Sequence, residues 1–254
     1  MGNHRARTDR NAGQRHPPKA KFAEQRQNFS DASLGFKQIR LTQKQQQLAK
    51  LIQQNDLIFV EGPAGSGKSL GVLHEFVKQY LVDNTREIVI IRTPVEAGGD
   101  KIGYLPDDLA SKIAPHFSSA KKLLEDLLSP SKVECDLGKR IKFVVPNYVL
   151  GSTLDNALIF IDEAQQMQPL ILKLLMERIG KNSVCVVAGD RSQLYTNDKQ
   201  RSGLTDAVKR FFREDHKGLM IPRWENVEHM RFEVEDVQRS EIVKTVIKAY
   251  SDML

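Results

Sequence analysis

The sequence has few cysteines, a single tryptophan and no long apolar run. Its two cysteines, Cys135 and Cys185, stand in neither CxxC nor CxxH spacing, which excludes a disulfide framework and a zinc site of that kind. We expect both thiols to be reduced and buried. Apolar runs reach only four or five residues, and the N-terminus has no apolar signal core. These absences favour a cytoplasmic protein without a membrane partner.

The positive charge is concentrated at the N-terminus. The 254 residues carry a net charge of +6, and residues 1–26 hold seven basic and two acidic side chains, so this segment accounts for +5. Residues 1–36 have no hydrophobic period, and we predict a disordered basic tail, followed by one domain over residues 37–254. Such a tail attracts nucleic-acid phosphates. The alternative is a solvated extension without a partner.

The body alternates short apolar runs with amphipathic stretches. Runs that are apolar at nearly every position predict parallel strands buried on both faces, with helices between them. We therefore expect an α/β fold with a mostly parallel sheet between helices. The predicted strands cover residues 57–60, 88–91, 141–145, 158–161, 184–188 and 231–237. The predicted helices cover residues 42–54, 70–80, 170–179 and a closing segment from Ser240 onward.

The first predicted strand runs into a phosphate-binding loop pattern. Residues 62–69 read GPAGSGKS and match G-x-x-x-x-G-K-[ST] in the required setting of strand, loop and helix. Glycines let successive backbone N–H groups point at phosphate oxygens. Lys68 is expected to bridge the β- and γ-phosphates of ATP, and Ser69 to bind Mg²⁺. The predicted nucleotide-binding residues of the loop are Gly62, Pro63, Ala64, Gly65, Ser66, Gly67, Lys68 and Ser69.

Two further polar groups follow buried strands. Asp162 and Glu163 end the strand LIFI, where a carboxylate enters the ligand crevice of a parallel sheet. We expect Asp162 to hold Mg²⁺ and Glu163 to act as general base. Gln193, after the strand VCVVA, is suited to sensing the γ-phosphate. The alternatives are an exposed helix start for the acidic pair and an ordinary Gly-Asp turn before Gln193.

Taken together, these motifs resemble the PhoH-like family of P-loop ATPases, over roughly residues 40–250. Residues 92–106 (RTPVEAGGDKIGYLP) are the most family-specific, and the short form with a basic tail looks like the phage-encoded members. The resemblance implies a RecA-like P-loop NTPase domain with ATP and Mg²⁺ as cofactors, in the host cytoplasm if the gene is phage-borne. One departure is residues 150–153, which read LGST where the family carries a basic form like RGRT.

Two more site residues follow from the resemblance. Gln45 lies in Leu41-Thr42-x-x-Gln45, similar to the adenine-reading glutamine motif of helicases, although a surface glutamine on a polar helix is the alternative. Arg239, in the C-terminal motif 236–239, is predicted to be the arginine finger, with Arg201 in reserve, and the alternative is a surface arginine paired with Glu235 or Glu241. Because the chain has room for one RecA-like domain, either the finger comes from another protomer or the hydrolysis is slow. That favours a ring-like homo-oligomer such as a hexamer.

The expected function is therefore ATP hydrolysis coupled to single-stranded nucleic acid, RNA in preference to DNA, with helicase activity as one form of it. The rival is a nucleic-acid-binding protein that uses ATP to control its assembly, with little turnover. The acidic pair disfavours the rival, whereas the missing arginines at residues 150–153 favour it. A small-molecule kinase is disfavoured because the DEAQ and GDxxQ motifs point to water as the phosphoryl acceptor.

Overall fold

The computed structural model describes residues 36–37, 39–94, 109–193 and 202–250. Its centre is a six-stranded sheet with the order β3-β2-β4-β5-β1-β8, in which every neighbouring pair is parallel. The strands are β1 (Leu57–Glu61), β2 (Glu87–Arg92), β3 (Ile141–Val144), β4 (Ala157–Asp162), β5 (Val184–Gly189) and β8 (Val227–Arg231). Five of the six predicted strands are confirmed by this sheet.

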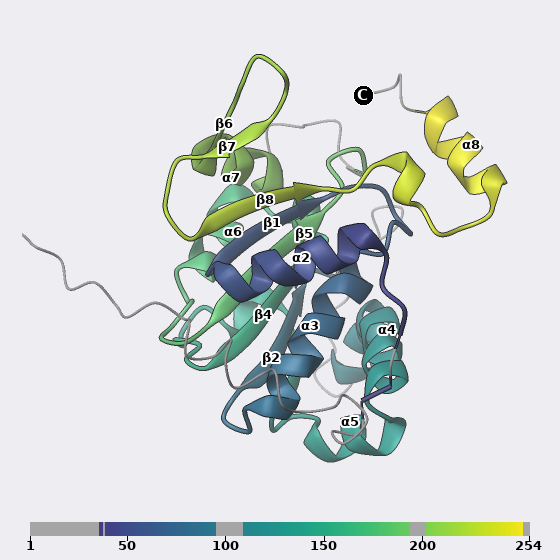
Figure 1. Ribbon diagram of the computed structural model, residues 1–254. Helices are drawn as coiled ribbons and strands as arrows, with labels where there is room; N and C mark the ends of the chain where they lie inside the picture. Colours follow the sequence, from purple (N-terminus) through teal and green to yellow (C-terminus); the bar gives the residue numbers. More distant parts are fainter. Residues whose placement is uncertain (1–35, 38, 95–108, 194–201, 251–254) are drawn as a thin grey trace, which may run out of the picture.

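Helices cover both faces of the sheet, which makes a three-layer α/β fold (Figure 1). One core lies under α2 to α5 and the other under α6 and α7, and alternate residues of the central strands enter each core. The helices are α2 (Gln43–Gln54), α3 (Lys68–Val82), α4 (Leu109–Leu127), α5 (Pro130–Asp136), α6 (Pro169–Met176), α7 (Gly203–Phe211) and α8 (Glu241–Ala249). The predicted α/β class is therefore confirmed.

Because all six strands run in the same direction, their carboxyl ends lie at one edge of the sheet. Glu61, Arg92, Asp162 and Gly189 are the last residues of β1, β2, β4 and β5. Loops leaving a parallel sheet at this edge form the crevice in which such folds bind ligands. The sheet order therefore brings four separate sequence motifs to a single place.

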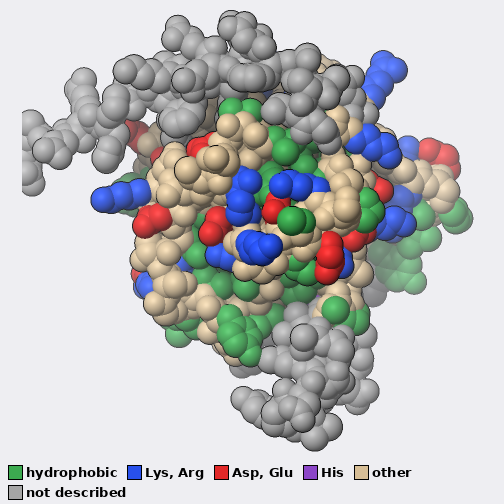
Figure 2. All heavy atoms as spheres, turned by 90° about the horizontal axis from the view of Figure 1, so that it is seen from below, with side chains coloured by type: hydrophobic (Ala, Val, Ile, Leu, Met, Phe, Trp, Pro, Cys, Tyr) green, Lys and Arg blue, Asp and Glu red, His purple; other side chains and the backbone are tan. Residues whose placement is uncertain are grey.

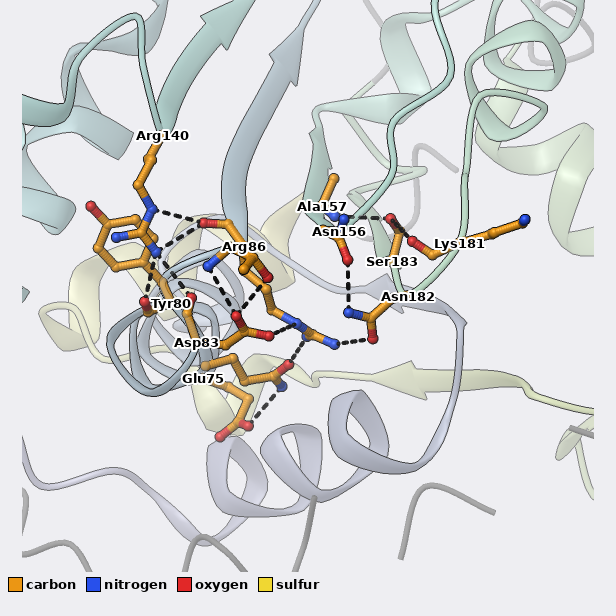
Figure 3. A network of polar contacts seen from close by, with 12 residues as sticks. Glu75, Tyr80, Asp83, Arg86, Arg140, Asn156, Ala157, Lys181, Asn182 and Ser183 are labelled. Atoms are coloured by element: carbon orange, nitrogen blue, oxygen red, sulfur yellow. Dashed lines mark hydrogen bonds and ion pairs between the residues drawn. The ribbon is translucent and has the colours of Figure 1, made fainter. Parts of the chain in front are cut away.

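The opposite edge is closed by a polar network at the end of α3 (Figure 3). The Arg140 guanidinium lies 3.9 Å from the centroid of the Tyr80 ring and donates to the backbone oxygens of Tyr80, Asp83 and Arg86 at 2.9 to 3.2 Å. Arg86 also donates to the Asn182 side chain at 3.0 Å. The network pairs the Tyr80 carbonyl in the last turn of α3 and the carbonyls of Asp83 and Arg86 in the turn that follows, and so fixes the end of the helix.

Three expectations need correction. Residues 231–237 do not form the last strand: β8 ends at Arg231, and a 3-10 turn with a reciprocal side-chain cap between Glu233 and Asp236 follows. The helix expected at residues 170–179 ends at Met176, because Ile179 makes a bridge to Leu154. Cys135 is exposed on α5, whereas Cys185 is buried as expected.

Some elements were not predicted at all. The helices α4 and α5 fill the segment before β3, and a two-stranded antiparallel hairpin joins β6 (Phe212–Glu214) to β7 (Met220–Pro222). None of the helices in the described ranges is long and apolar enough to cross a membrane. The expected tail falls on residues that the structure does not describe, apart from Phe36.

Candidate nucleotide site

The phosphate loop connects β1 to α3 at the carboxyl edge of the sheet. Gly67 has a φ of 86°, in the left-handed region that favours glycine, and a Cβ there would meet Gln45 Nε2 at 2.3 Å. The Gln45 amide donates to the Gly67 carbonyl at 3.1 Å, and its oxygen accepts from the Thr42 N–H at 2.9 Å. Gln45 is only 2% exposed. It is therefore no surface glutamine: it packs α2 against the loop.

Lys68 is the first residue of α3, and its charge faces three carboxylates. Its ammonium donates to the carbonyls of Gly62 and Pro63, the latter at 2.9 Å. Burial lowers the pKa of Lys68 below its ordinary value, and the negative charges of Asp190, Asp162 and Glu163 offset part of that shift, in that order. Asp190 is thus the carboxylate that acts most strongly on Lys68.

The acidic pair lies at the end of β4 and is contacted by Arg92. The cation reaches Asp162 at 3.6 Å and Glu163 at 3.5 Å, because β2 pairs with β4 and places Arg92 opposite Asp162. Burial and the adjacent Glu163 nevertheless raise the pKa of Asp162 to about 6. A carboxyl group that resists ionisation beside a second carboxylate ionises more readily when another cation binds. The raised pKa of Asp162 therefore favours a cation-binding site at this pair.

Gln165 links the acidic pair to the next strand. Its amide donates to Glu163 at 2.6 Å, and its oxygen accepts from the backbone N–H of Asp190 at 3.1 Å. Gln165 is 1% exposed, so the bridge is shielded from water. The following Gln166 donates to the backbone oxygen of Gln193 at 2.6 Å. The ends of β4 and β5 are therefore held together by the glutamines of the DEAQ segment and its neighbour.

Glu61, directly before the phosphate loop, is buried with two basic partners. Its carboxylate accepts from His229 Nε2 at 2.6 Å and from Arg191 at 2.9 Å, and its side chain is 4% exposed. Burial acts to raise the pKa of Glu61, but the hydrogen bond from His229 and the charge of Arg191 outweigh it and hold the pKa below the ordinary value. This cluster joins β8, β1 and the loop after β5.

The C-terminal segment also contacts the phosphate loop. The backbone N–H of Gln238 donates to the Gly65 carbonyl at 3.0 Å, and Val237 is buried. A Cβ on Gly65, whose φ is 81°, would meet Arg239 Nε at 2.6 Å. The Arg239 side chain therefore lies against the tip of the phosphate loop of its own chain. Lys44 holds the same segment through an ion pair of 2.8 Å with Asp236.

Two buried side-chain oxygens at this edge of the sheet could bind a nucleotide together with Mg²⁺. Asp190 Oδ2 and Thr93 Oγ1 are buried side-chain oxygens without a hydrogen-bond partner within the described part of the chain. Both follow strand ends at the carboxyl edge of the sheet. Buried polar atoms of this kind call for an explanation such as a bound ion or ligand. The donor set, which is hydroxyl and carboxylate oxygen, is the one that Mg²⁺ prefers.

Three residues near the predicted site residues have no assigned role in the sequence-based prediction. Arg92, Thr93 and Asp190 were read only as parts of motifs and received no role. Their place at the carboxyl edge depends on β2, β4 and β5 being neighbours, and a single sequence does not give that order. Gln193 is exposed, and Arg201 and residues 95–106 of the family-specific segment lie outside the described residues.

Comparison with known proteins identifies the family to which this chain belongs. The sequence signature described as PhoH-like protein matches residues 38–251. The chain belongs to the PhoH-like family. A PhoH-like protein of Synechocystis is 33% identical over 82% of this chain, and one of Bacillus subtilis is 32% identical over 84%. Protein PhoH of Escherichia coli is 31% identical over 80%.

This PhoH-like chain spans 55% to 64% of the length of those relatives. Among solved structures, the large terminase of a thermophilic bacteriophage has a TM-score of 0.47 at 13% identity, over 85% of this chain and 51% of that one. Bacteroides Pif1 bound to ssDNA has a TM-score of 0.36 at 14% identity, over 83% and 46%. The P-loop fold is assigned from the sheet order and the phosphate loop of this chain itself.

Proposed function

We propose that this chain is an ATPase that binds Mg²⁺-ATP in the loop of residues 62–69 and couples hydrolysis to single-stranded nucleic acid, RNA in preference to DNA. The observation that carries the proposal is the convergence of Lys68, Asp162, Glu163 and Asp190 at the carboxyl edge of one parallel sheet. Two cations, Lys68 and Arg92, face three carboxylates, and this arrangement suits a substrate that arrives with phosphate and metal together.

In the proposed site, each residue has a separate task. The backbone N–H groups of the loop and the Lys68 ammonium bind the phosphates, for which Lys68 leaves the carbonyls of Gly62 and Pro63. Ser69 and Asp162 would hold Mg²⁺, whose charge offsets that of the phosphates. Glu163 accepts a proton from the attacking water, and Gln165 fixes its carboxylate.

Two arginines and two glutamines complete the proposal. Arg92 offsets part of the negative charge of the acidic pair before the metal arrives. Arg239 supplies positive charge to the nucleotide from the tip of the loop. Gln193 senses the γ-phosphate, and Gln45 holds Gly67 in place. The contact of Gln45 with adenine remains a prediction. The role of the basic tail as the main binding site for nucleic acid also remains a prediction.

ATP turnover with and without single-stranded RNA or DNA tests the proposal. Turnover that needs Mg²⁺ and rises several-fold with RNA, less with DNA, is the expected result. Arg92→Gln should lower the Mg²⁺ concentration that gives half-maximal turnover, since the ion then binds the acidic pair without a neighbouring cation that repels it. Slow turnover that RNA leaves unchanged, together with ATP-dependent assembly, would support the rival function as an assembly-controlled binding protein.

Self-association is part of the same proposal. A chain with one RecA-like domain offers one face of an ATP site, and the family resemblance favours a ring. The mass of the full-length protein in solution, measured with and without ATP, tests this part on its own.

A further inference from the structure

An ion pair joins the residue before the phosphate loop to the turn that follows β5. Arg191 donates through Nη2 to Glu61 Oε1 at 2.9 Å, and its Nε pairs with the other carboxylate oxygen. The Glu61 side chain is 4% exposed, whereas that of Arg191 is 32% exposed. Two contacts between a guanidinium and a carboxylate fix the orientation of both groups. The pair is therefore a rigid connection between the end of β1 and the loop after β5.

The Glu61 side of this pair is anchored on the face of the sheet that α6 and α7 cover. Side chains alternate along a strand, and Glu61 shares its face with Phe59, which packs in the core of that side. His229 contacts the same carboxylate at 2.6 Å, and its ring lies 5.4 Å from the ring of Phe212. The phosphate loop instead leads into α3 on the other face. The Glu61 carboxylate consequently lies behind the loop and is shielded from a nucleotide held by Lys68.

The Arg191 side of the pair lies in a tight turn of residues 190–193. The backbone N–H of Gln193 donates to the Asp190 carbonyl at 3.0 Å, which closes the turn. The backbone N–H of Ser192 donates to the Asp190 carboxylate at 2.9 Å. Arg191 is the second residue of this turn, so Asp190 and Gln193 stand at its two ends. A contact that fixes Arg191 therefore fixes both end residues in relation to the phosphate loop.

The other side of the turn is held by the loop of the acidic pair. Gln165 accepts from the Asp190 N–H at 3.1 Å, and Gln166 donates to the Gln193 carbonyl at 2.6 Å. The turn is thus held from two sides. Asp190 keeps one buried oxygen, Oδ2, without a hydrogen-bond partner among the residues that the structure describes, and it is the carboxylate that acts most strongly on Lys68. The turn therefore faces the place that the proposed function gives to the γ-phosphate.

We propose that Glu61 and Arg191 are positioning residues for ATP hydrolysis, which hold Asp190 and Gln193 opposite Lys68. Neither member of the pair contacts the nucleotide, and both act through the turn. A misplacement of about 1 Å can slow a reaction on the order of 100-fold. Loss of the pair therefore slows the chemical step, while the phosphate loop still binds nucleotide. The inference rests on the proposed ATPase function and deepens it by naming the residues that set the γ-phosphate side of the site.

Arg191→Gln and Glu61→Gln test the pair from its two ends. Each variant should lower kcat roughly 10-fold or more, while its affinity for a non-hydrolysable ATP analogue stays within about 2-fold of wild type. The double variant should be no slower than the slower single variant, because both substitutions remove the same contact. Arg140→Lys is the matched control, since it weakens the fold at the opposite edge of the sheet, and its kcat should equal that of wild type.

Hydrogen exchange of the full-length protein measures the position of the turn without reference to turnover. The backbone N–H groups of Ser192 and Gln193 donate within the turn. Both should exchange several-fold faster in Arg191→Gln and Glu61→Gln than in wild type, at a temperature where every variant is folded. In Arg140→Lys the exchange of these two groups should be unchanged, because that substitution lies far from the turn.

The results separate this proposal from its rivals. Normal kcat in either variant, an equal loss in Arg140→Lys or additive losses in the double variant would overturn it. A loss confined to Arg191→Gln, together with weaker binding of the ATP analogue, would also overturn it and make Arg191 a phosphate ligand. Wild-type protein that binds the analogue but does not hydrolyse ATP overturns the proposed function and this inference with it. Wild-type turnover that both substitutions leave unchanged overturns the inference alone.

Discussion

At the scale of single residues, Glu163 has a backbone that few residues adopt. Its φ of 54° and ψ of 39° lie in the left-handed region, which costs a residue other than glycine about 1 kcal/mol or more. Strain of this kind persists where the surroundings enforce it, and here the Gln165 amide holds the Glu163 carboxylate. Asp162 is the last residue of β4, whereas Glu163 has already left the strand conformation. This observation supports Glu163, rather than Asp162, as the general base.

Glu163→Gln should therefore keep nucleotide binding and stop turnover. The amide has the same shape but cannot accept the proton of water, so kcat is expected to fall by roughly 10²- to 10⁴-fold. Lys68→Ala should instead weaken nucleotide binding as well, because the phosphates lose their cation. Steady-state kinetics and titration with a non-hydrolysable ATP analogue separate the two effects. Normal turnover of the glutamine variant would remove Glu163 from the catalytic assignment.

Glu61 gives the protein a defined response to acid. Its pKa is held below the ordinary value of 4.5 by His229 and Arg191. A carboxylate with a depressed folded-state pKa stabilises the fold above its unfolded-state pKa, and this contribution is lost as the pH falls through the folded-state value. Part of the stability of the wild-type protein should therefore disappear below about pH 4.5.

Glu61→Gln should lower the free energy of unfolding at pH 7 by about 2 kcal/mol, since Arg191 and His229 lose a buried anion. The difference from wild type should shrink as the pH falls from about 4.5 through the lower folded-state pKa of Glu61, below which the wild-type carboxylate is itself protonated. Urea unfolding at several pH values measures both quantities. Glu87→Gln, which breaks a half-exposed pair with Lys142, is the control and should change stability little. A difference that stays constant with pH would contradict the account of the Glu61 pKa.

At the scale of secondary-structure elements, α3 is fixed at both ends. Gly67 and Gln45 meet at its start, and Arg140 pairs with the backbone oxygens at its end (Figure 3). A lysine at position 140 can neither stack flat on the Tyr80 ring nor reach three carbonyls with one planar group.

Arg140→Lys should therefore lower the free energy of unfolding by about 1 to 2 kcal/mol, as measured by chemical denaturation. Lys139→Met is the matched control, because Lys139 donates to a single exposed carbonyl, that of Cys135. Equal effects of the two substitutions would mean that the network does not fix the helix. Nucleotide affinity should stay the same in both variants at temperatures where they are folded.

Most of the strands that the sequence predicts correctly are buried on both sides, and the exception is the edge strand β3, whose apolar residues are only partly buried beyond Ile141. β1 and β5 are buried at every position, which leaves continuous apolar runs that are visible without a structure. β8 lies at the sheet edge and buries only Val227 and Met230 of its five residues, so it leaves no such run and was placed too late. The hairpin strands β6 and β7 are three residues each, too short for any periodicity. Likewise, the role of Arg92 follows from which strands pair, and that is long-range information.

At the scale of the whole molecule, the net positive charge lies mainly in the N-terminal tail and the body is nearly neutral. On the face shown in Figure 2, the Lys and Arg side chains of the described body are interspersed with Asp and Glu, and no large patch of one charge is seen there. Residues 1–26 account for +5 of the net +6. Attraction to a phosphate backbone should therefore depend mainly on the tail.

Deletion of residues 1–30 should weaken binding to single-stranded RNA and flatten its salt dependence, with basal ATP turnover little changed. Each lost phosphate contact reduces the slope of log K against log salt by about 0.7 for single strands. Fluorescence anisotropy at several salt concentrations measures the slope. Replacing the seven basic residues by glutamine, at unchanged length, is the control and should give the same loss. An unchanged slope would show that the body binds nucleic acid without the tail.

The position of Arg239 decides whether this arginine acts on the nucleotide of its own chain or on that of a neighbouring protomer. A ring of single RecA-like domains is expected to supply an arginine to each ATP site from the neighbouring protomer. In this structure, however, the Arg239 side chain lies against Gly65 of its own chain, and the adjacent Gln238 is bonded to the same loop residue. We therefore expect Arg239 to act on the nucleotide of its own chain.

Mixed oligomers of Lys68→Ala and Arg239→Ala protein distinguish the two arrangements. If Arg239 acts within its own chain, each protomer of a mixed oligomer lacks either the lysine or the arginine, and ATP turnover should stay as low as in the separate variants. If it acts across an interface, some interfaces pair an intact loop with an intact arginine, and turnover should partly recover. Differently tagged variants, purified in two steps, ensure that only mixed oligomers are assayed. Recovery would mean that the contact with Gly65 is exchanged for the neighbouring loop when the ring assembles, because the guanidinium cannot lie against both loops at once.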